Sequence, residues 1–205
     1  MKIIDISIPV IKGMVVWPKS AEPCFKRSVS DLWIETEIGL GLHTGTHIDA
    51  PLHRIKGGST TDKLPLEAMV GPVFVAFLPK AKVITSKELD GLHLPGGTER
   101  LLFKTSNSNF WAKKEKKFQK KFVGLSPGGA SWLVENKIKL IGNDYLSVAK
   151  FDEQPEVHEI LLKNKIILLE GLDLSKVKQG VYQLICLPLK LAGTEAAPVR
   201  AILVR

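Results

Sequence analysis

The segment from His43 to His53 constrains the fold most, because it holds three of the five histidines and reads His-Thr-Gly-Thr-His-Ile-Asp-Ala-Pro-Leu-His. Its glycine, β-branched residues and proline disfavour a helix. In an extended strand alternate side chains share a face, so His43, Gly45, His47 and Asp49 are predicted to lie on one side. Two imidazoles and a carboxylate then converge, and the glycine leaves room for an ion. This donor set suits zinc, manganese or iron.

Two residues elsewhere in the chain could complete such a site. Glu170 follows four apolar residues at the end of a predicted strand, where a carboxylate is costly unless it is paired or bound to metal. His158 lies on the predicted helix before that strand. Alone, Glu170 could be an ordinary salt-bridge partner and His158 a surface or core histidine. The histidine cluster favours ligand roles for both, because metal sites draw ligands from distant segments.

The remaining sequence alternates strands with helices and shows no repeat or linker. Of its 205 residues 44% are apolar and 24% are charged, which predicts one globular domain spanning residues 1–205. The pattern indicates a single α/β domain with a mixed sheet. Strands are predicted at 2–10, 33–40, 71–78, 100–104, 138–142, 166–169, 182–187 and 199–204, and helices at 86–89, 127–136 and 156–162.

A net charge of +8 raises the question of an anionic partner. Six lysines lie between Lys113 and Lys121, and Trp111, Phe118 and Phe122 are spaced by seven and four residues, which predicts an apolar helical stripe beneath them. A solvated helix face is the favoured interpretation of this run, with an anionic partner as the alternative. Binding of nucleic acid is not expected, because no recognition motif accompanies the lysines and the charges elsewhere are mixed.

Membrane and secretion signals are not evident in the sequence. No apolar run approaches the roughly 18 residues that span a bilayer, and the first residues do not resemble a signal peptide, so a cytoplasmic protein is expected. Cys24 and Cys186 lie far apart and are predicted to be reduced thiols rather than a disulfide.

The sequence resembles the metal-dependent cyclase family, which includes bacterial kynurenine formamidases. The segment from His43 to His53 matches the family signature H-x-G-T-H-x-D-x-P-x-H. Further likeness covers 71–72, 99–100, 127–144, 158, 166–172, 187–190 and 197–200, and so extends over nearly the whole chain. The resemblance implies an α/β fold of the swivelling β/β/α type, with a mixed, barrel-like central sheet and flanking helices, in a homodimer.

The resemblance also implies a centre of two divalent metal ions, zinc with manganese as the alternative. His43 and His47 would bind one ion and His158 the other, while the carboxylates of Asp49 and Glu170 bridge both. A bridge needs two donor oxygens, whereas a neutral imidazole offers one lone pair.

Two further roles follow from the resemblance. His53 would be the catalytic proton donor and acceptor, and Trp17 would line the substrate pocket. A proline breaks the strand alternation before His53, which fits a separate role for that histidine. Service of His53 as a fifth protein ligand stays open as the alternative.

Three departures from the family pattern concern the substrate. Trp17-Pro18-Lys19-Ser20 stands where the family has Trp-Pro-Gly-Asp, Arg54 replaces a phenylalanine, and Asn143 replaces an apolar residue. The expected function is metal-dependent hydrolysis of a small-molecule amide, such as the aryl formamide of N-formylkynurenine. One alternative is an enzyme that opens a cyclic amide, such as isatin, or a lactone. The other is a metal-stabilised binding protein without turnover.

Overall fold

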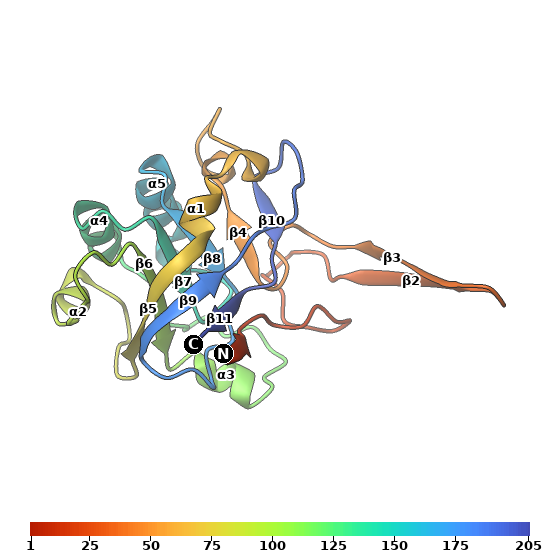
Figure 1. The fold of residues 1–205 in the computed structure, drawn as a ribbon, viewed down its shortest axis with the longest axis horizontal. Helices are drawn as coiled ribbons and strands as arrows, with labels where there is room; N and C mark the ends of the chain where they lie inside the picture. The colour runs from red at the N-terminus through yellow and green to blue at the C-terminus, as the bar shows by residue number, and fades with distance from the viewer.

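The computed structural model describes residues 1–205, which form one nine-stranded sheet, a separate hairpin and several helices (Figure 1). The sheet order is β1-β11-β9-β5-β6-β7-β8-β4-β10. Its strands are β1 (Ile3–Asp5), β4 (His47–Asp49), β5 (Val70–Leu78), β6 (Arg100–Thr105), β7 (Leu140–Asn143), β8 (Ile167–Glu170), β9 (Gly180–Ile185), β10 (Ala196–Pro198) and β11 (Ile202–Val204). The helices are α1 (Leu66–Met69), α2 (Ser86–Asp90), α3 (Ser108–Ala112), α4 (Pro127–Glu135) and α5 (Gln154–Lys163), with 3-10 turns η1 (Pro51–His53), η2 (Thr61–Lys63) and η3 (Phe151–Glu153).

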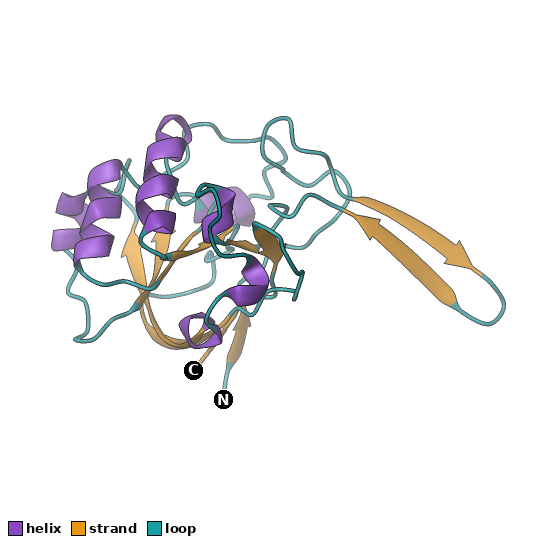
Figure 2. Ribbon diagram, turned by 90° about the horizontal axis from the view of Figure 1, so that it is seen from above, coloured by secondary structure: helices purple, strands orange, loops and turns teal.

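The sheet is mixed and strongly curled (Figure 2). Strands β5 to β8 run parallel, and the strands on either side of them pair antiparallel. Just after β1, Ser7 pairs with Leu172 beyond β8, and the Asp173 N–H donates to the Ile6 carbonyl over 2.9 Å. These contacts draw distant strands together, which confirms the predicted α/β fold with a barrel-like sheet. The first strand ends at Asp5, shorter than the predicted 2–10.

Apolar side chains fill both faces of the central strands. In β6, Leu102 faces the inside of the curl, whereas Leu101 and Phe103 belong to the second core, which includes residues of α4 and α5. Such strands read as continuous apolar runs because both faces are buried. The predicted helices 127–136 and 156–162 are confirmed as α4 and α5. None of the helices combines the length and the apolar character that crossing a membrane requires.

The lysine-rich segment is not the predicted helix. Helix α3 ends at Ala112, Lys114 adopts a left-handed φ of 54°, and the chain continues through turns to Phe122. The aromatic residues are nevertheless inside one cluster, with Phe118 5.0 Å from Trp17 between ring centroids. Their spacing matched a helical stripe, but they reach that cluster along an irregular path.

A hairpin projects from the body as an isolated arm, residues 24–39 (Figures 1 and 2). It consists of β2 (Cys24–Val29) and β3 (Ile34–Gly39), of which only β3 was predicted, and every residue of both strands is exposed. Phe25 pairs with Ile38 and Val29 with Ile34, so these four side chains share one face of the ribbon. The charged pair Lys26 and Glu37 lies on the other face, with 3.5 Å between nitrogen and oxygen.

Both cysteines are free, as predicted from their separation. Cys24 is exposed at the base of the arm, and Cys186 is buried. The Cys186 thiol donates to the Met69 carbonyl over 3.4 Å, and burial raises the pKa of this thiol to about 12. Cys186 is therefore a protonated core residue at neutral pH.

Candidate metal centre

Strand β4 carries His47 and Asp49 into the middle of the site. It lies between β8 and β10, with His47 opposite Glu170 and Asp49 opposite Ala196. The side chains of His47 and Asp49 share one face because strand residues alternate, while Ile48 enters the core on the other. The predicted alternation is confirmed for this part of the segment.

The alternation does not extend back to His43. Residues 42–46 form a turn, in which Gly45 has a left-handed φ of 70°. A Cβ on Gly45 would lie 3.2 Å from Val10 Cγ2, so this glycine packs against the protein and makes no room for an ion. His43 still reaches the cluster, with its Nδ1 2.9 Å from Asp49 Oδ1.

A second glycine allows this turn to approach the end of β8. Gly171 has φ of 71°, and a Cβ there would collide with the Gly45 carbonyl oxygen. The Thr46 hydroxyl donates to the Gly171 carbonyl and accepts from the Ile8 N–H over 2.9 Å. These contacts hold the loop before β4 against the loop after β8, and so fix His47 opposite Glu170.

The five predicted ligands all lie around two carboxylates. His47 Nε2 is 3.4 Å from Asp49 Oδ1 and 3.5 Å from Glu170 Oε2. His158, on α5, places Nε2 3.3 Å from Glu170 Oε1 and 3.9 Å from Asp49 Oδ2. Histidine and carboxylate side chains from three elements and one turn thus form two neighbouring groups that share Asp49, one with His43 and His53 and one with His47 and Glu170.

The chemistry of this cluster fits a bound cation. Both carboxylate oxygens of Asp49 and the Nε2 atom of His47 are buried, and none has a partner with hydrogen-bond geometry; their close polar neighbours are other candidate ligands. Unpaired buried polar atoms are costly, and a divalent ion would satisfy all three at once. Nitrogen and carboxylate oxygen are the donors that zinc and manganese take in proteins.

The titration of these groups in the metal-free protein points the same way. Burial alone lowers the pKa of His47, but the negative charges of the nearby Asp49 and Glu170 carboxylates outweigh it and raise that pKa to about 10. Burial raises the pKa of Glu170, yet the neighbouring imidazoles of His158 and His47 lower it overall to about 2. The site therefore keeps its carboxylates charged and stabilises positive charge between them.

His53 lies beside the cluster at the end of η1, where Pro51 ends the strand geometry as predicted. Its ring centroid is 4.4 Å from that of His43 and 5.7 Å from that of His158. Half-burial lowers the pKa of His53, which keeps the imidazole neutral at pH 7. Donor atoms of His43, Asp49 and His53 also lie within 4.8 Å of one another, so both predicted alternatives for His53 fit.

Several contributors were not identified from the sequence. Glu170 Oε1 accepts from the Val148 N–H over 2.8 Å and from the Ser147 hydroxyl over 3.2 Å. Asn143 Nδ2 in turn donates to the Ser147 carbonyl over 2.6 Å. Glu195 Oε1 lies 3.5 Å from His43 Nε2, across the β4–β10 edge. Ser147 and Val148 lie in the loop after β7, and Glu195 directly precedes β10, so contacts between distant segments bring them near the ligands and no local pattern marks them.

Trp17 is not among the residues that meet at the carboxylates. It is half-buried in an aromatic cluster, stacked on Phe151 with centroids 5.3 Å apart and planes 25° apart. Its other ring neighbours are Phe118 and Phe122, and none of its ring contacts is a histidine. Trp17 therefore neighbours η3, the turn that leads into the helix carrying His158.

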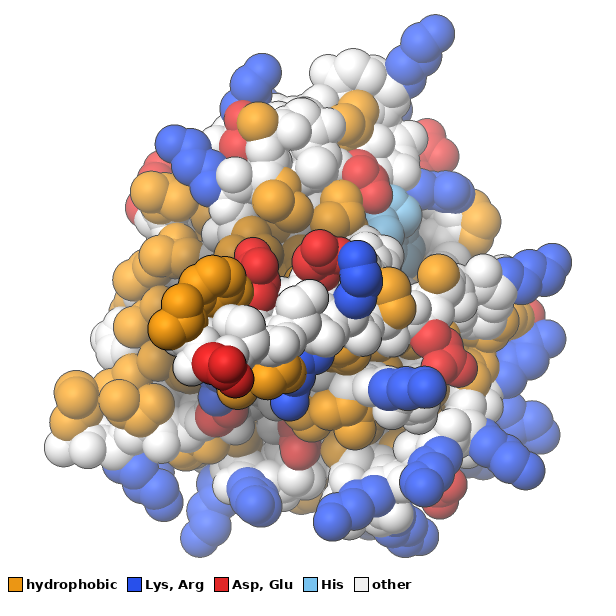
Figure 3. Space-filling view, turned by 90° about the vertical axis from the view of Figure 1, so that its right-hand side faces the viewer, with side chains coloured by type: hydrophobic (Ala, Val, Ile, Leu, Met, Phe, Trp, Pro, Cys, Tyr) orange, Lys and Arg blue, Asp and Glu red, His pale blue; other side chains and the backbone are white.

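The side of the molecule from which the arm projects shows histidine surface next to acidic side chains (Figure 3). Among the predicted ligands the His43 side chain is 31% exposed, while those of His47 and Asp49 are 1% exposed. A small molecule would thus approach the centre past His43 and the half-buried His53.

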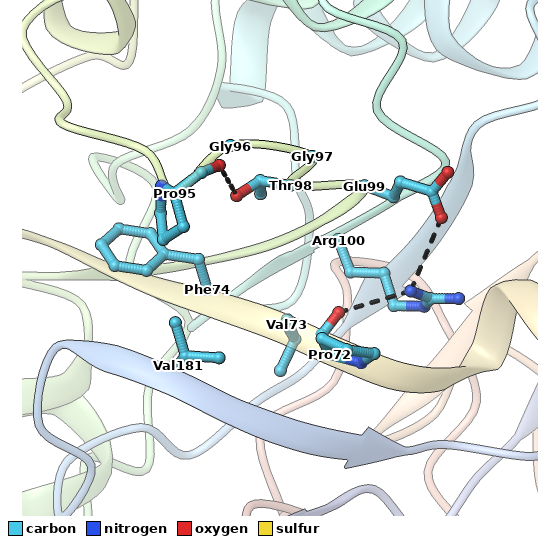
Figure 4. A pocket seen from close by; sticks show the side chains of 10 residues that line it. All are labelled: Pro72, Val73, Phe74, Pro95, Gly96, Gly97, Thr98, Glu99, Arg100 and Val181. Carbon is cyan, nitrogen blue, oxygen red and sulfur yellow. Dashed lines mark hydrogen bonds and ion pairs between the residues drawn. The ribbon is translucent and has the colours of Figure 1, made fainter.

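A separate cavity of about 260 Å³ lies between the start of β6 and the edge of β9 (Figure 4). Phe74 and Val181 line it, and no candidate ligand does. Its buried Arg100 donates to the carbonyls of Ala68, Glu67 and Pro72, so the guanidinium is occupied by the backbone. The polar side chain of Arg100 therefore supports the backbone, and the cavity contains no group of candidate catalytic or metal-binding residues.

Known proteins resemble this chain in sequence. The family profile described as "Putative cyclase" matches residues 4–150. "Cyclase-like protein 1" of Arabidopsis thaliana is 44% identical over 176 residues, covering 83% of this chain and 69% of that protein. "Kynurenine formamidase" of Salinibacter ruber is 38% identical over 213 residues, covering 99% of this chain and 97% of that enzyme.

The fold is shared with solved structures as well. A structure described as a potential metal-dependent hydrolase with cyclase activity superposes with a TM-score of 0.86 at 35% identity. The match covers 98% of this chain and 96% of the other. Fold, sequence profile and near-full-length relatives agree, and the chain belongs to the cyclase family.

Proposed function

We propose that this protein is a metal-dependent hydrolase that cleaves the amide bond of an aryl formamide, N-formylkynurenine or a close relative. The observation that carries the proposal is the group of buried nitrogen and oxygen atoms of His47 and Asp49 that have no hydrogen-bond partner. They lie next to a half-buried, neutral His53. The similarity to a kynurenine formamidase over nearly the whole chain supports the substrate class.

Two divalent ions, zinc or manganese, would occupy the centre. His43 and His47 would hold one ion and His158 the other, with Asp49 and Glu170 between them. The contacts of both carboxylates with imidazoles on two sides support bridging roles. The bound ions would supply Lewis acidity and a water that is nucleophilic at neutral pH.

His53 would carry the proton of the reaction. The imidazole is neutral at pH 7, so it can accept a proton from the attacking water. Hydroxide adds to the formyl carbon, the carbon–nitrogen bond breaks, and His53 returns the proton to the leaving aryl nitrogen. The products are a free arylamine and formic acid, which releases its proton to give formate at neutral pH, and water is the only other reactant.

Trp17 would form an aromatic wall for the substrate ring. Its half-exposed indole and its stacking on Phe151 support this role, because a ring held on one face can offer the other to a ligand. Arg54, exposed next to His53, would contact substituents of the substrate.

The test is turnover by protein of known metal content. Protein loaded with zinc or manganese should hydrolyse N-formylkynurenine and formanilides, and chelation followed by reloading should abolish and restore that activity. Isatin and simple lactones belong in the same assay. Preferential opening of those rings would replace the formamide assignment, and full metal occupancy without turnover would favour a metal-stabilised binding protein.

We infer, in addition, that the protein works as a homodimer to which the arm contributes. A lone two-stranded hairpin is marginally stable in water, and this one exposes Phe25, Val29, Ile34 and Ile38 on one face. The arm carries three acidic and two basic side chains in a chain of +8, which leaves +9 on the remainder. The body of a second copy therefore complements it in charge.

A further inference from the structure

Two of the proposed ligand histidines share one arrangement. His47 Nδ1 lies 3.0 Å from the Gly45 carbonyl oxygen, and His158 Nδ1 lies 2.9 Å from that of Gln154. In both rings Nε2 is the atom that faces the carboxylates. A backbone carbonyl can thus accept a hydrogen bond from the outer nitrogen of each ring, and in the neutral ring this tautomer leaves the inner nitrogen with a lone pair for a cation.

His43 is turned the other way. Its Nδ1 faces Asp49 Oδ1 at 2.9 Å, and its outer nitrogen, Nε2, lies 3.5 Å from Glu195 Oε1. No backbone carbonyl holds this ring, which sits on a turn and is the most exposed of the three histidines. A side-chain carboxylate therefore lies on the side of His43 where the other two rings have a backbone carbonyl.

The sheet fixes Glu195 where this contact can form. Its carbonyl accepts the Ala50 N–H over 2.9 Å, and the next residue, Ala196, pairs with Asp49 in β10. The Glu195 carboxylate makes no other ion pair or hydrogen bond, and its side chain is 40% exposed. The backbone of Glu195 is therefore fixed by the sheet, while its carboxylate has no competing partner that would hold it away from the His43 ring.

We infer that Glu195 is a positioning residue for His43, an assignment that rests on the proposed metal centre. By accepting the Nε2 proton, Glu195 would hold the ring in one tautomer and orientation, with Nδ1 free to bind the ion. Carboxylates behind ligand histidines make the imidazole a stronger donor. Glu195 would thus tighten the ion on the exposed side of the centre.

Metal titration with a chelating competitor tests this role. Glu195→Ala should weaken binding of one zinc ion by about 10- to 100-fold, the usual effect of losing such a partner, and leave the ion at His158 unchanged. Glu195→Gln, which keeps an acceptor oxygen without charge, should restore part of the loss. Glu99→Gln is the matched control, because Glu99 pairs with Lys139 away from the site.

Two measurements separate positioning from a general structural effect. In a His43→Ala background the Glu195→Ala substitution should cost no further affinity, because the two residues act on the same ligand. In zinc-loaded protein, ¹⁵N NMR of the histidine rings should show His43 protonated at Nε2, and Glu195→Ala should alter that signal alone.

The outcomes against the inference are distinct. Unchanged zinc affinity in Glu195→Ala, or an equal loss in the His43→Ala background, would remove Glu195 from the role while the metal centre stands. Wild-type protein that binds no divalent ion would overturn the centre and the role together.

Discussion

At the scale of single residues, charge balance explains why the centre favours a cation. Asp49 and Glu170 are both buried and both charged, and the neighbouring histidines hold the pKa of each carboxyl below its usual range despite burial. In the metal-free protein a protonated His47 supplies the compensating charge. Stability should therefore depend on pH in two directions.

The metal-free protein should be most stable between pH 4.5 and 6.5. The pKa of His47 rises from 6.5 to about 10 on folding, so its contribution is complete below pH 6.5 and is lost as pH rises toward 10. The pKa of Glu170 falls from 4.5 to about 2, so its contribution is complete above pH 4.5 and is lost as pH falls toward 2. Melting temperatures across a pH series check this, and a maximum at pH 9 would contradict it.

His53→Asn should retain metal and lose turnover. Asparagine cannot carry the proton, so the rate should fall by about 10²- to 10⁴-fold, the usual contribution of a positioned acid–base group. Metal content and turnover must be measured on the same sample. Loss of metal would make His53 a ligand, and full activity with metal retained would leave it no catalytic part.

At the scale of elements, the centre depends on two loops that touch. The turn before β4 meets the turn after β8, where Gly171 lies against the Gly45 carbonyl. Both glycines have left-handed φ values, so the close approach and the backbone geometry require the same residue type.

Gly171→Ala should destabilise the protein and weaken metal binding, because the new Cβ meets the backbone of Gly45. Gly193→Ala is the matched control, since Gly193 has a similar φ of 78° and a Cβ there would have no neighbour within 4 Å. Strain alone costs about 1–3 kcal/mol in each, and only Gly171→Ala adds the collision. Equal melting temperatures and zinc affinities for the two variants would refute the closeness of the loops.

The lysine-rich segment should not contribute to catalysis. Replacing Lys113, Lys114, Lys116 and Lys117 with glutamine should leave kcat and KM nearly unchanged, because these side chains are exposed and make no ion pair. Steady-state kinetics on the folded variant is the measurement. A raised KM would show that the segment recruits an anionic substrate.

The sequence predicted what local patterns determine. Alternation placed His47 and Asp49 on one face, and the buried apolar run before Glu170 predicted β8. The turn that carries His43 depends on the contact of Gly45 with Gly171, which lies 126 residues after Gly45 in the chain. An aromatic spacing around the lysines satisfied a helical pattern, yet tertiary packing formed that cluster from an irregular segment. In both places, the His43 turn and the lysine-rich segment, contacts between distant segments explain why the structure differs from the prediction.

At the scale of the whole molecule, the arm is the part whose strands do not pack against the rest of the chain. Its apolar face should be covered in a dimer, so Val29→Lys with Ile34→Lys should shift the protein from dimer to monomer. Lys26→Gln with Glu37→Gln, on the opposite face, is the control and should leave the dimer intact. Sedimentation equilibrium checks both, and a wild-type monomer at micromolar concentration would contradict the homodimer.

The strand order also sets when the centre can form during synthesis. Strand β4 ends at residue 49, but its two neighbours are β8, which begins at residue 167, and β10, which begins at residue 196. The signature histidines must therefore leave the ribosome long before either partner strand exists. The proposed ligand set is complete only after Glu170, and the neighbouring edge of the sheet closes only when β10 has been made. Metal would then bind late, and it would stabilise the finished chain by mass action.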